Sequence, residues 1–538
     1  MASDSQVGQA ALLERGQDST REAWLATGWR ATRALAGRPE SVVTLFTAFH
    51  LGVSFLNQVV LAYLFGVSAE MDAFLAAGAL PLAVLGLVIG ELGFVLVPLL
   101  TRERRDAGGA AEAASRLFTL LVIAGLGVAL LGVAGHGWIL RLTTHTAIPA
   151  ATLELAIALA PWIWLLVGLN FVCSFFTGLY HFHRRFALPA VVLSLPYLGM
   201  IVGGLGWSPG FGIRSVVYGW TAGTLVKTVV LAAGIWKESG LGFRWTLGHP
   251  LNRELGMSLV PLGVALLPFT VLPVVDVFWA SGLPHGSVSA LGYASRIGIA
   301  LTTLLVQGIA VVLFPALADD GAAGKREEFR AKLVAALQTI LLLILPVAAL
   351  TAALRVPLLG LLFERGSFDR GDTLAVARVL PWYLVGMLGM APMNVVSRGF
   401  FALSDYRTPA WLGLGSLGAY AALCALLVPN FSYAGIAMAY AAVWPATFLV
   451  QTRFLGKAIG PLLDGEMFRL LLQVGTSALL GALLAESLVG QLQPRLGAIP
   501  GLLLSGLAGL GAFAGLAYFV FKVPHLRMLV AGIGVGKR

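Results

Sequence analysis

Residues 274–296 read VVDVFWASGLPHGSVSALGYASR, two apolar arms joined by a turn at 282–284. One arm carries Asp276 and the other carries Arg296. Each lies about six or seven residues from the turn, which puts both roughly 9 Å below the same surface. Apolar arms of this kind are typical of a hairpin of membrane-spanning helices, and a charge within such a hairpin needs a partner. We therefore expect Asp276 and Arg296 to be partners across the hairpin.

The rest of the sequence has the same apolar character. Of the 538 residues, 58% are hydrophobic and 12% are charged, and the mean hydropathy is +0.87. Soluble domains carry roughly 25% charged residues. The composition therefore excludes a large soluble domain and places the chain in the lipid bilayer.

Apolar runs bounded by charge, proline or glycine predict about 14 transmembrane helices. Their expected limits are 41–65, 73–100, 116–140, 150–178, 187–207, 213–236, 256–282, 289–317, 333–355, 379–403, 409–429, 433–455, 468–491 and 497–521. The expected fold class is an all-α polytopic membrane protein with two six-helix lobes around a central cleft and two additional C-terminal helices.

Lysine and arginine alternate from loop to loop, as the positive-inside rule requires. The net charge of +10 and the pI of 9.8 therefore indicate membrane orientation, and no nucleic acid is expected as a partner. The N-terminal segment 1–40 and the tail 522–538 are both expected to be cytoplasmic, in a bacterial cytoplasmic (inner) membrane. The loop 355–378 has mixed charge, which favours a short helix in the membrane interface.

The stretch QVVLAYLFGVSAEMDAFLAAG, which begins at Gln58, runs parallel to the stretch DVFWASGLPHGSVSALGYASR from Asp276. This match predicts two parallel repeats, an N-lobe at 41–236 and a C-lobe at 256–455, with 468–521 as additions. A chance match between two apolar hairpins is the alternative.

Polar groups inside the spans mark candidate substrate-binding positions. For Asp276 and Arg296 the alternative is a buried ion pair that only fixes the hairpin. For Asp72 it is a favourable charge at a helix N-terminus, and Lys227 has the alternative of reaching the membrane interface. The full set of candidates is Arg296, Asp276, Asn57, Gln58, Asp72, Glu91 and Lys227.

Enzyme motifs fail on inspection. The tail AGIGVGKR lacks the first glycine of a phosphate loop and ends in Arg538 where serine or threonine would hold magnesium. His181 and His183 have no further ligand nearby, and the two cysteines lie far apart in apolar segments. We expect no enzyme activity, no metal and no cofactor.

Five stretches are similar to the MviN/MurJ family of the multidrug/oligosaccharidyl-lipid/polysaccharide exporter superfamily. They occur in the family's order and read AYLFGVSAEMDAF, YHFHRRFALPA, VDVFWASGLPHGSVSALGYASR, LLFERGSFDRGDT and GFFALSDYRTP. The resemblance implies a 14-helix flippase for lipid II, an undecaprenyl-pyrophosphate-linked saccharide precursor of peptidoglycan in cell-wall synthesis.

The resemblance also implies arginines in the first, second and eighth spans. Arg296 matches the eighth-span arginine, whereas the other positions fall near Leu51, at Asn57 and Gln58, and near Leu85. Asp276 matches a carboxylate linked in the family to cation coupling, but the eleventh span has no acidic partner for it, which puts sodium dependence in doubt.

The sequence leaves several functions open. The first is a flippase for lipid II, in which Arg296 contacts phosphate and Asp276 holds or releases Arg296. An exopolysaccharide or other glycan precursor is a second possible cargo. A non-transporting scaffold for glycan-assembly enzymes and a small-molecule antiporter are the alternatives from other classes.

Overall fold

The computed structural model describes residues 39–103, 109–245 and 249–523. This part of the chain is helical and contains no strand. The N-terminal helices are α2 Pro39–Phe65, α3 Ala69–Glu103, α4 Gly109–Thr143, α5 Ala150–Phe182, α6 Ala187–Val192, α7 Leu195–Phe211 and α8 Arg214–Ser239. The remaining helices are α9 Pro250–Ala280, α10 Ser287–Ala322, α11 Arg326–Ala353, α12 Arg355–Phe363, α13 Arg370–Ala402, α14 Arg407–Phe431, α15 Tyr433–Ile459, α16 Gly465–Leu496, α17 Ala498–Gly515 and the π-helix η1 Leu516–Val520.

The all-α membrane fold is confirmed. Thirteen helices of the described chain are long and apolar enough to cross a membrane. Helix α9 covers the predicted seventh span and is 31 residues long. Since an unsatisfied backbone group costs several kcal/mol in lipid, these apolar segments must form complete helices.

Two predicted spans differ most from the observed helices. The fifth divides into α6 and α7, and Pro196 lies at the start of α7, where a missing N–H costs no helical hydrogen bond. The tenth begins nine residues earlier than predicted, at Arg370, because Asp369 and Asp372 form a capping box there. The short helix expected in the loop 355–378 is α12. The segments 1–38 and 524–538 lie outside the described residues.

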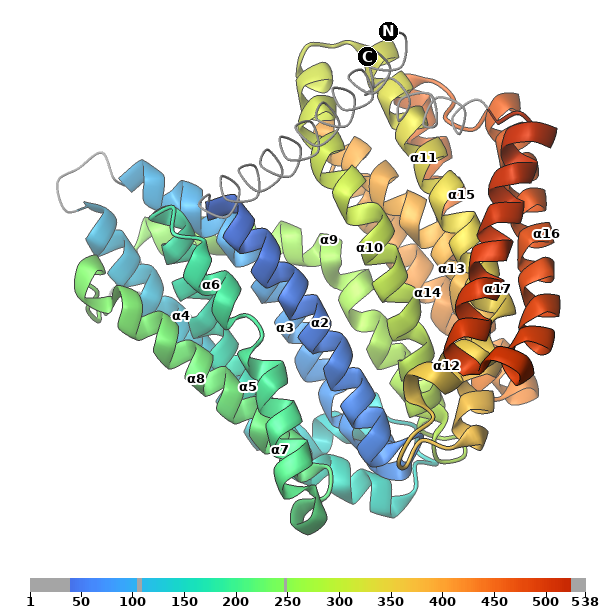
Figure 1. Ribbon diagram of the computed structural model, residues 1–538. Helices are drawn as coiled ribbons and strands as arrows, with labels where there is room; N and C mark the ends of the chain where they lie inside the picture. Colours follow the sequence, from blue (N-terminus) through green and yellow to red (C-terminus); the bar gives the residue numbers. More distant parts are fainter. Residues whose placement is uncertain (1–38, 104–108, 246–248, 524–538) are drawn as a thin grey trace, which may run out of the picture.

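Figure 1 shows two groups of helices that approach each other at one end and diverge toward the other. We call α2–α8 the N-lobe and α9–α15 the C-lobe; α16 and α17 pack on each other and against α11. The diverging end carries basic loops such as those at Arg185, Lys325 and Arg407, and we call it the basic end. The opposite end is called the sealed end.

Helix α9 of the C-lobe contacts both groups. It packs chiefly against α3 of the N-lobe and α14 of the C-lobe, and only slightly against α10, its partner in the predicted hairpin. The six-residue turn 281–286 is long enough to let the two arms separate. This arrangement decides which side chains meet in the membrane.

Candidate substrate site between the lobes

Arg296 lies on α10 and reaches across to the N-lobe. Its Nη1 donates a hydrogen bond to Oε1 of Gln58 on α2, a residue 238 positions away. Both residues are partly buried. One turn closer to the sealed end, the Tyr293 hydroxyl donates to the backbone oxygen of Gly66 at 3.3 Å. The predicted candidates Arg296 and Gln58 are therefore brought together where the two lobes meet.

The predicted pairing of Asp276 with Arg296 is wrong. Oδ1 of Asp276 instead accepts a hydrogen bond from the Tyr420 hydroxyl of α14. The two charges lie at similar depth, but α9 and α10 make little contact, so Asp276 faces α14 while Arg296 faces α2. The expected exchange in which Asp276 releases Arg296 therefore has no basis in this arrangement.

Asp72 joins the lobes at the sealed end. The residue is 5% exposed, and its two carboxylate oxygens accept hydrogen bonds from the backbone N–H groups of Gly286 at 2.6 Å and Ser289 at 2.7 Å. These two groups belong to the first turn of α10, whose unpaired N–H groups attract negative charge. Asp72 of the N-lobe thus caps a C-lobe helix, and both its oxygens are occupied in this conformation.

A second carboxylate strengthens the seal. Oδ2 of Asp372, at the start of α13, accepts a hydrogen bond from the backbone N–H of Val67 at 2.9 Å. Beside it, the Ser367 N–H donates to the Tyr63 oxygen at 2.8 Å, and the Ser367 hydroxyl donates to the Leu64 oxygen at 3.0 Å. The turn between α2 and α3 is therefore held by the segment between α12 and α13.

The other predicted residues lie away from Arg296. Asn57 is 1% exposed and its Nδ2 lies 3.7 Å from the Met200 sulfur, so it faces the packing between α2 and α7. Lys227 is partly buried on α8 and interacts electrostatically with His50 and Cys173. The side chain of Glu91 lies outside the described residues.

Three functional contacts were not predicted from the sequence. Tyr420 is the partner of Asp276, and it lies in the eleventh span, where only an acidic residue was considered. The backbone of Gly286 and Ser289 binds Asp72, and Asp372 was assigned to an interfacial loop. For the last two contacts, the signal in the sequence was an acidic residue, Asp72 or Asp372, close to a turn that contains glycine.

The described side chains contain no group of three or more His, Cys, Asp or Glu placed to hold a metal ion. Cys173 and Cys424 are buried free thiols.

A family model described as "Lipid II flippase MurJ" matches residues 61–492. The chain belongs to the MurJ lipid II flippase family. The "Lipid II flippase MurJ" of Burkholderia cenocepacia is 24% identical over 407 residues, covering 74% of this chain and 79% of that protein. The "Probable lipid II flippase MurJ" of Bdellovibrio bacteriovorus is 27% identical over 382 residues, covering 68% of this chain and 72% of that protein.

Solved structures establish the same fold. A structure described as "Lipid II flippase MurJ, inward closed conformation" has a TM-score of 0.74 at 20% identity and covers 91% of this chain and 99% of that chain. An inward-facing multidrug resistance MATE family transporter of the MOP superfamily has a TM-score of 0.64 at 17% identity and covers 76% of this chain and 94% of that chain. The MurJ-like arrangement thus extends over nearly the whole chain.

The N-lobe positions at which the resemblance implied arginines are uncharged here. Leu51 is exposed on α2, Leu85 is partly buried on α3, and Gln58 is neutral. Arg296 is therefore the cation at the lobe junction among the positions that the resemblance singled out. A neutral Gln58 holds its guanidinium without cancelling its charge.

Proposed function

We propose that this protein flips lipid II, the undecaprenyl-pyrophosphate-linked precursor of peptidoglycan, across the cytoplasmic membrane of a bacterium by alternating access. Membership in the MurJ family over residues 61–492 is the observation that carries this proposal. The cross-lobe contact between Arg296 and Gln58 supports it, because a cargo that parts the lobes meets a cation at their junction.

The basic loops support a cytoplasmic position for the diverging end, since lysine and arginine favour that side. In this orientation both termini are cytoplasmic and the sealed end faces outward. The conformation then corresponds to an inward-facing state. Lipid II would enter from the inner leaflet and leave after the seal opens.

Arg296 is expected to bind the pyrophosphate of the cargo. A guanidinium presents several N–H donors in a fixed plane, which matches phosphate oxygens better than an ammonium does. Gln58 keeps the side chain extended toward the N-lobe and is displaced when phosphate arrives. Each charge-assisted hydrogen bond contributes about 1.5–3 kcal/mol, so losing one lowers affinity roughly 10- to 150-fold.

The test is complementation of a bacterium depleted of its own lipid II flippase. Wild-type protein should restore growth and lipid II exposure, whereas Arg296→Ala should restore neither at equal abundance in the membrane. Arg296→Lys should restore part of the activity because it keeps the charge without the planar donor set. The matched control is Arg407→Ala, an exposed arginine at the basic end, which should remain active.

Full activity of Arg296→Ala would refute the assigned role of the guanidinium. Failure of the wild-type protein to expose lipid II would refute lipid II as the cargo. The alternative cargo in that case is another lipid-linked glycan. Restored export of such a glycan in a strain lacking its flippase would identify it.

A further inference from the structure

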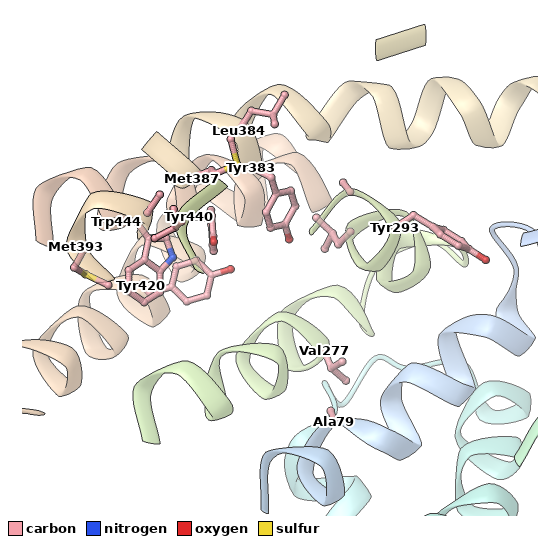
Figure 2. Packing of buried hydrophobic residues seen from close by; sticks show 14 of the residues in the cluster. Ala79, Val277, Tyr293, Tyr383, Leu384, Met387, Met393, Tyr420, Tyr440 and Trp444 are labelled. Carbon is pink, nitrogen blue, oxygen red and sulfur yellow. The ribbon is translucent and has the colours of Figure 1, made fainter. Parts of the chain in front are cut away.

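The strongest feature outside the Arg296 junction is a carboxyl group surrounded by phenols inside the C-lobe. Asp276 of α9 accepts a hydrogen bond from Tyr420 of α14, and Tyr383 of α13 and Tyr440 of α15 interact electrostatically with it. The rings of Tyr383 and Tyr440 lie 4.9 Å apart. Figure 2 shows the three tyrosines gathered on one side of α9, which carries Val277 next to Asp276.

We propose that Asp276, Tyr383 and Tyr420 form a proton-binding site that couples a proton to the conformational cycle. We call these three residues the carboxyl–phenol site. The inference deepens the proposed flippase function by naming its coupling ion, and it depends on that function only for the transport measurement below. It starts from the cost of a carboxylate in a membrane segment, which must find a cation or take up a proton.

The described neighbours of Asp276 do not supply a cation. Tyr420 and Cys424 face it from α14, and both are completely buried. On α10, Arg296 is directed to Gln58, and beyond the end of α4 the His145 ring lies against Phe278 and Trp279 at 5.8 and 6.4 Å. Asp276 forms no ion pair with any of the described residues. Proton uptake is the remaining way to neutralise it.

Tyr383 supplies a second independent observation. It is 2% exposed, and its hydroxyl has no hydrogen-bond partner among the described residues. A buried hydroxyl without a hydrogen-bond partner destabilises the fold unless another group forms a hydrogen bond to it in a second protonation state of the site. When Asp276 is protonated, its O–H is able to donate a hydrogen bond to the Tyr383 oxygen, while Tyr420 donates one to the other carboxyl oxygen.

A sodium ion fits this site less well. In transporters with discontinuous helices, unwound backbone carbonyls supply ligands for the coupling cation. Here α9, α13, α14 and α15 continue as helix through Asp276, Tyr383, Tyr420 and Tyr440. The carbonyl groups of these four residues point along their helices, where the i+4 residues are not proline, so the nearest ligands are one carboxylate and phenol oxygens.

The position of α9 links the proton to the lobes. Asp276 is partly buried on α9. Its helix packs against α3 on one side and α14 on the other. The protonated form stabilises the conformation in which Asp276 faces the tyrosines, and loss of the proton favours one in which the carboxylate meets water.

The first experiment is infrared spectroscopy of the full protein in vesicles of neutral lipid and sodium-free buffer across a pH series. The expected result is a protonated carboxylic acid band that Asp276→Asn removes and that Asp319→Asn, at an exposed carboxylate, leaves in place. Tyr420→Phe should shift both the band and its pH midpoint, whereas Tyr406→Phe, at an exposed tyrosine, should shift neither. Size-exclusion chromatography of each variant confirms that it is folded.

A wild-type spectrum with no band attributable to Asp276 at any pH would overturn the proposal. So would removal of the band by sodium at constant pH, since sodium would then compete for the site. The second experiment measures lipid II flipping in proteoliposomes after a pH step or a sodium step. Wild type should respond to pH alone, and Asp276→Asn should lose the pH response.

The two experiments separate the proposals. If lipid II is not moved but the Asp276 band is present, the cargo assignment fails and the proton site stands. If lipid II is moved with equal rate at every pH, the coupling role fails and the flippase function stands.

Discussion

Asp72→Asn should open the sealed end. In the structure the carboxylate accepts two hydrogen bonds from the first turn of α10, at 2.6 Å from Gly286 and 2.7 Å from Ser289. An asparagine keeps one acceptor and turns its amide N–H toward the other backbone donor. The change removes one hydrogen bond to a charged group, about 1.5–3 kcal/mol, and a favourable charge at a helix N-terminus, about 0.3–1 kcal/mol.

The two losses add to about 2–4 kcal/mol, because both contacts break when the lobes separate at this end. The ratio of sealed to open molecules should therefore fall roughly 30-fold or more. The assay is a spin-label distance measurement between Ala147→Cys and Asn430→Cys, which are exposed at the sealed ends of the two lobes. The native cysteines are buried and leave these positions selectively reactive.

The expected result is a new population at longer distance in Asp72→Asn. Glu70→Gln is the matched control, because Glu70 is exposed on the same helical turn and loses the same charge. An unchanged distance distribution in Asp72→Asn would refute the latch. An equal shift in Glu70→Gln would show that overall charge, and not the cap on α10, controls the seal.

Further substitutions at Gly286, Gly389 and Gln58 test the lobe junction and the packing inside the C-lobe. Gly286→Ala should reduce the free energy of unfolding by more than about 1 kcal/mol and so lower the melting temperature. The φ of Gly286 is +87°, and a Cβ there would lie 2.7 Å from a side chain of the α2–α3 turn. Gly389→Ala should lower it as well, since a Cβ would lie 2.3 Å from the backbone of α15, whereas Gly418→Ala has open space and should be neutral or stabilising. Gln58→Leu should reduce lipid II flipping by leaving the Arg296 guanidinium without its acceptor, and Gln58→Glu, measured in the same assay, should reduce it further by neutralising the cation.

The membrane spans were predictable because they depend on local sequence. Length and apolar composition decide whether a segment crosses the bilayer, and the predicted seventh and eighth spans fall on α9 and α10. Helix starts were less predictable. Asp369 and Asp372 read as parts of a charged loop, but their capping geometry extends α13 to Arg370.

The partners of buried charges were not predictable in the same way. Asp276 and Tyr420 are 144 residues apart, and Arg296 and Gln58 are 238 residues apart. Sequence places each residue at a depth in the membrane, but the rotation and contacts of each helix decide what it faces. The hairpin argument assumed that neighbours in sequence are neighbours in space, and the contact between α9 and α14 shows why it failed. The residue limits predicted for the two lobes stay predictions, as does the proposal that the lobes are parallel repeats of each other.

Helix α9 has the mechanical position needed to connect the seal with the carboxyl–phenol site. Near its basic end, Glu254 pairs with Arg102 of α3, and beyond its other end Ser281 accepts a hydrogen bond from the backbone N–H of His145 at 2.9 Å. Both ends are thus attached to the N-lobe, while Asp276 is attached to the C-lobe through Tyr420. When the lobes rock, such a helix must either bend or release one attachment. Because Pro268 and Pro273 each remove a helical hydrogen bond, α9 bends most easily just before Asp276. A proton that strengthens or weakens the hydrogen bond between Asp276 and Tyr420 therefore acts next to the point at which the helix bends.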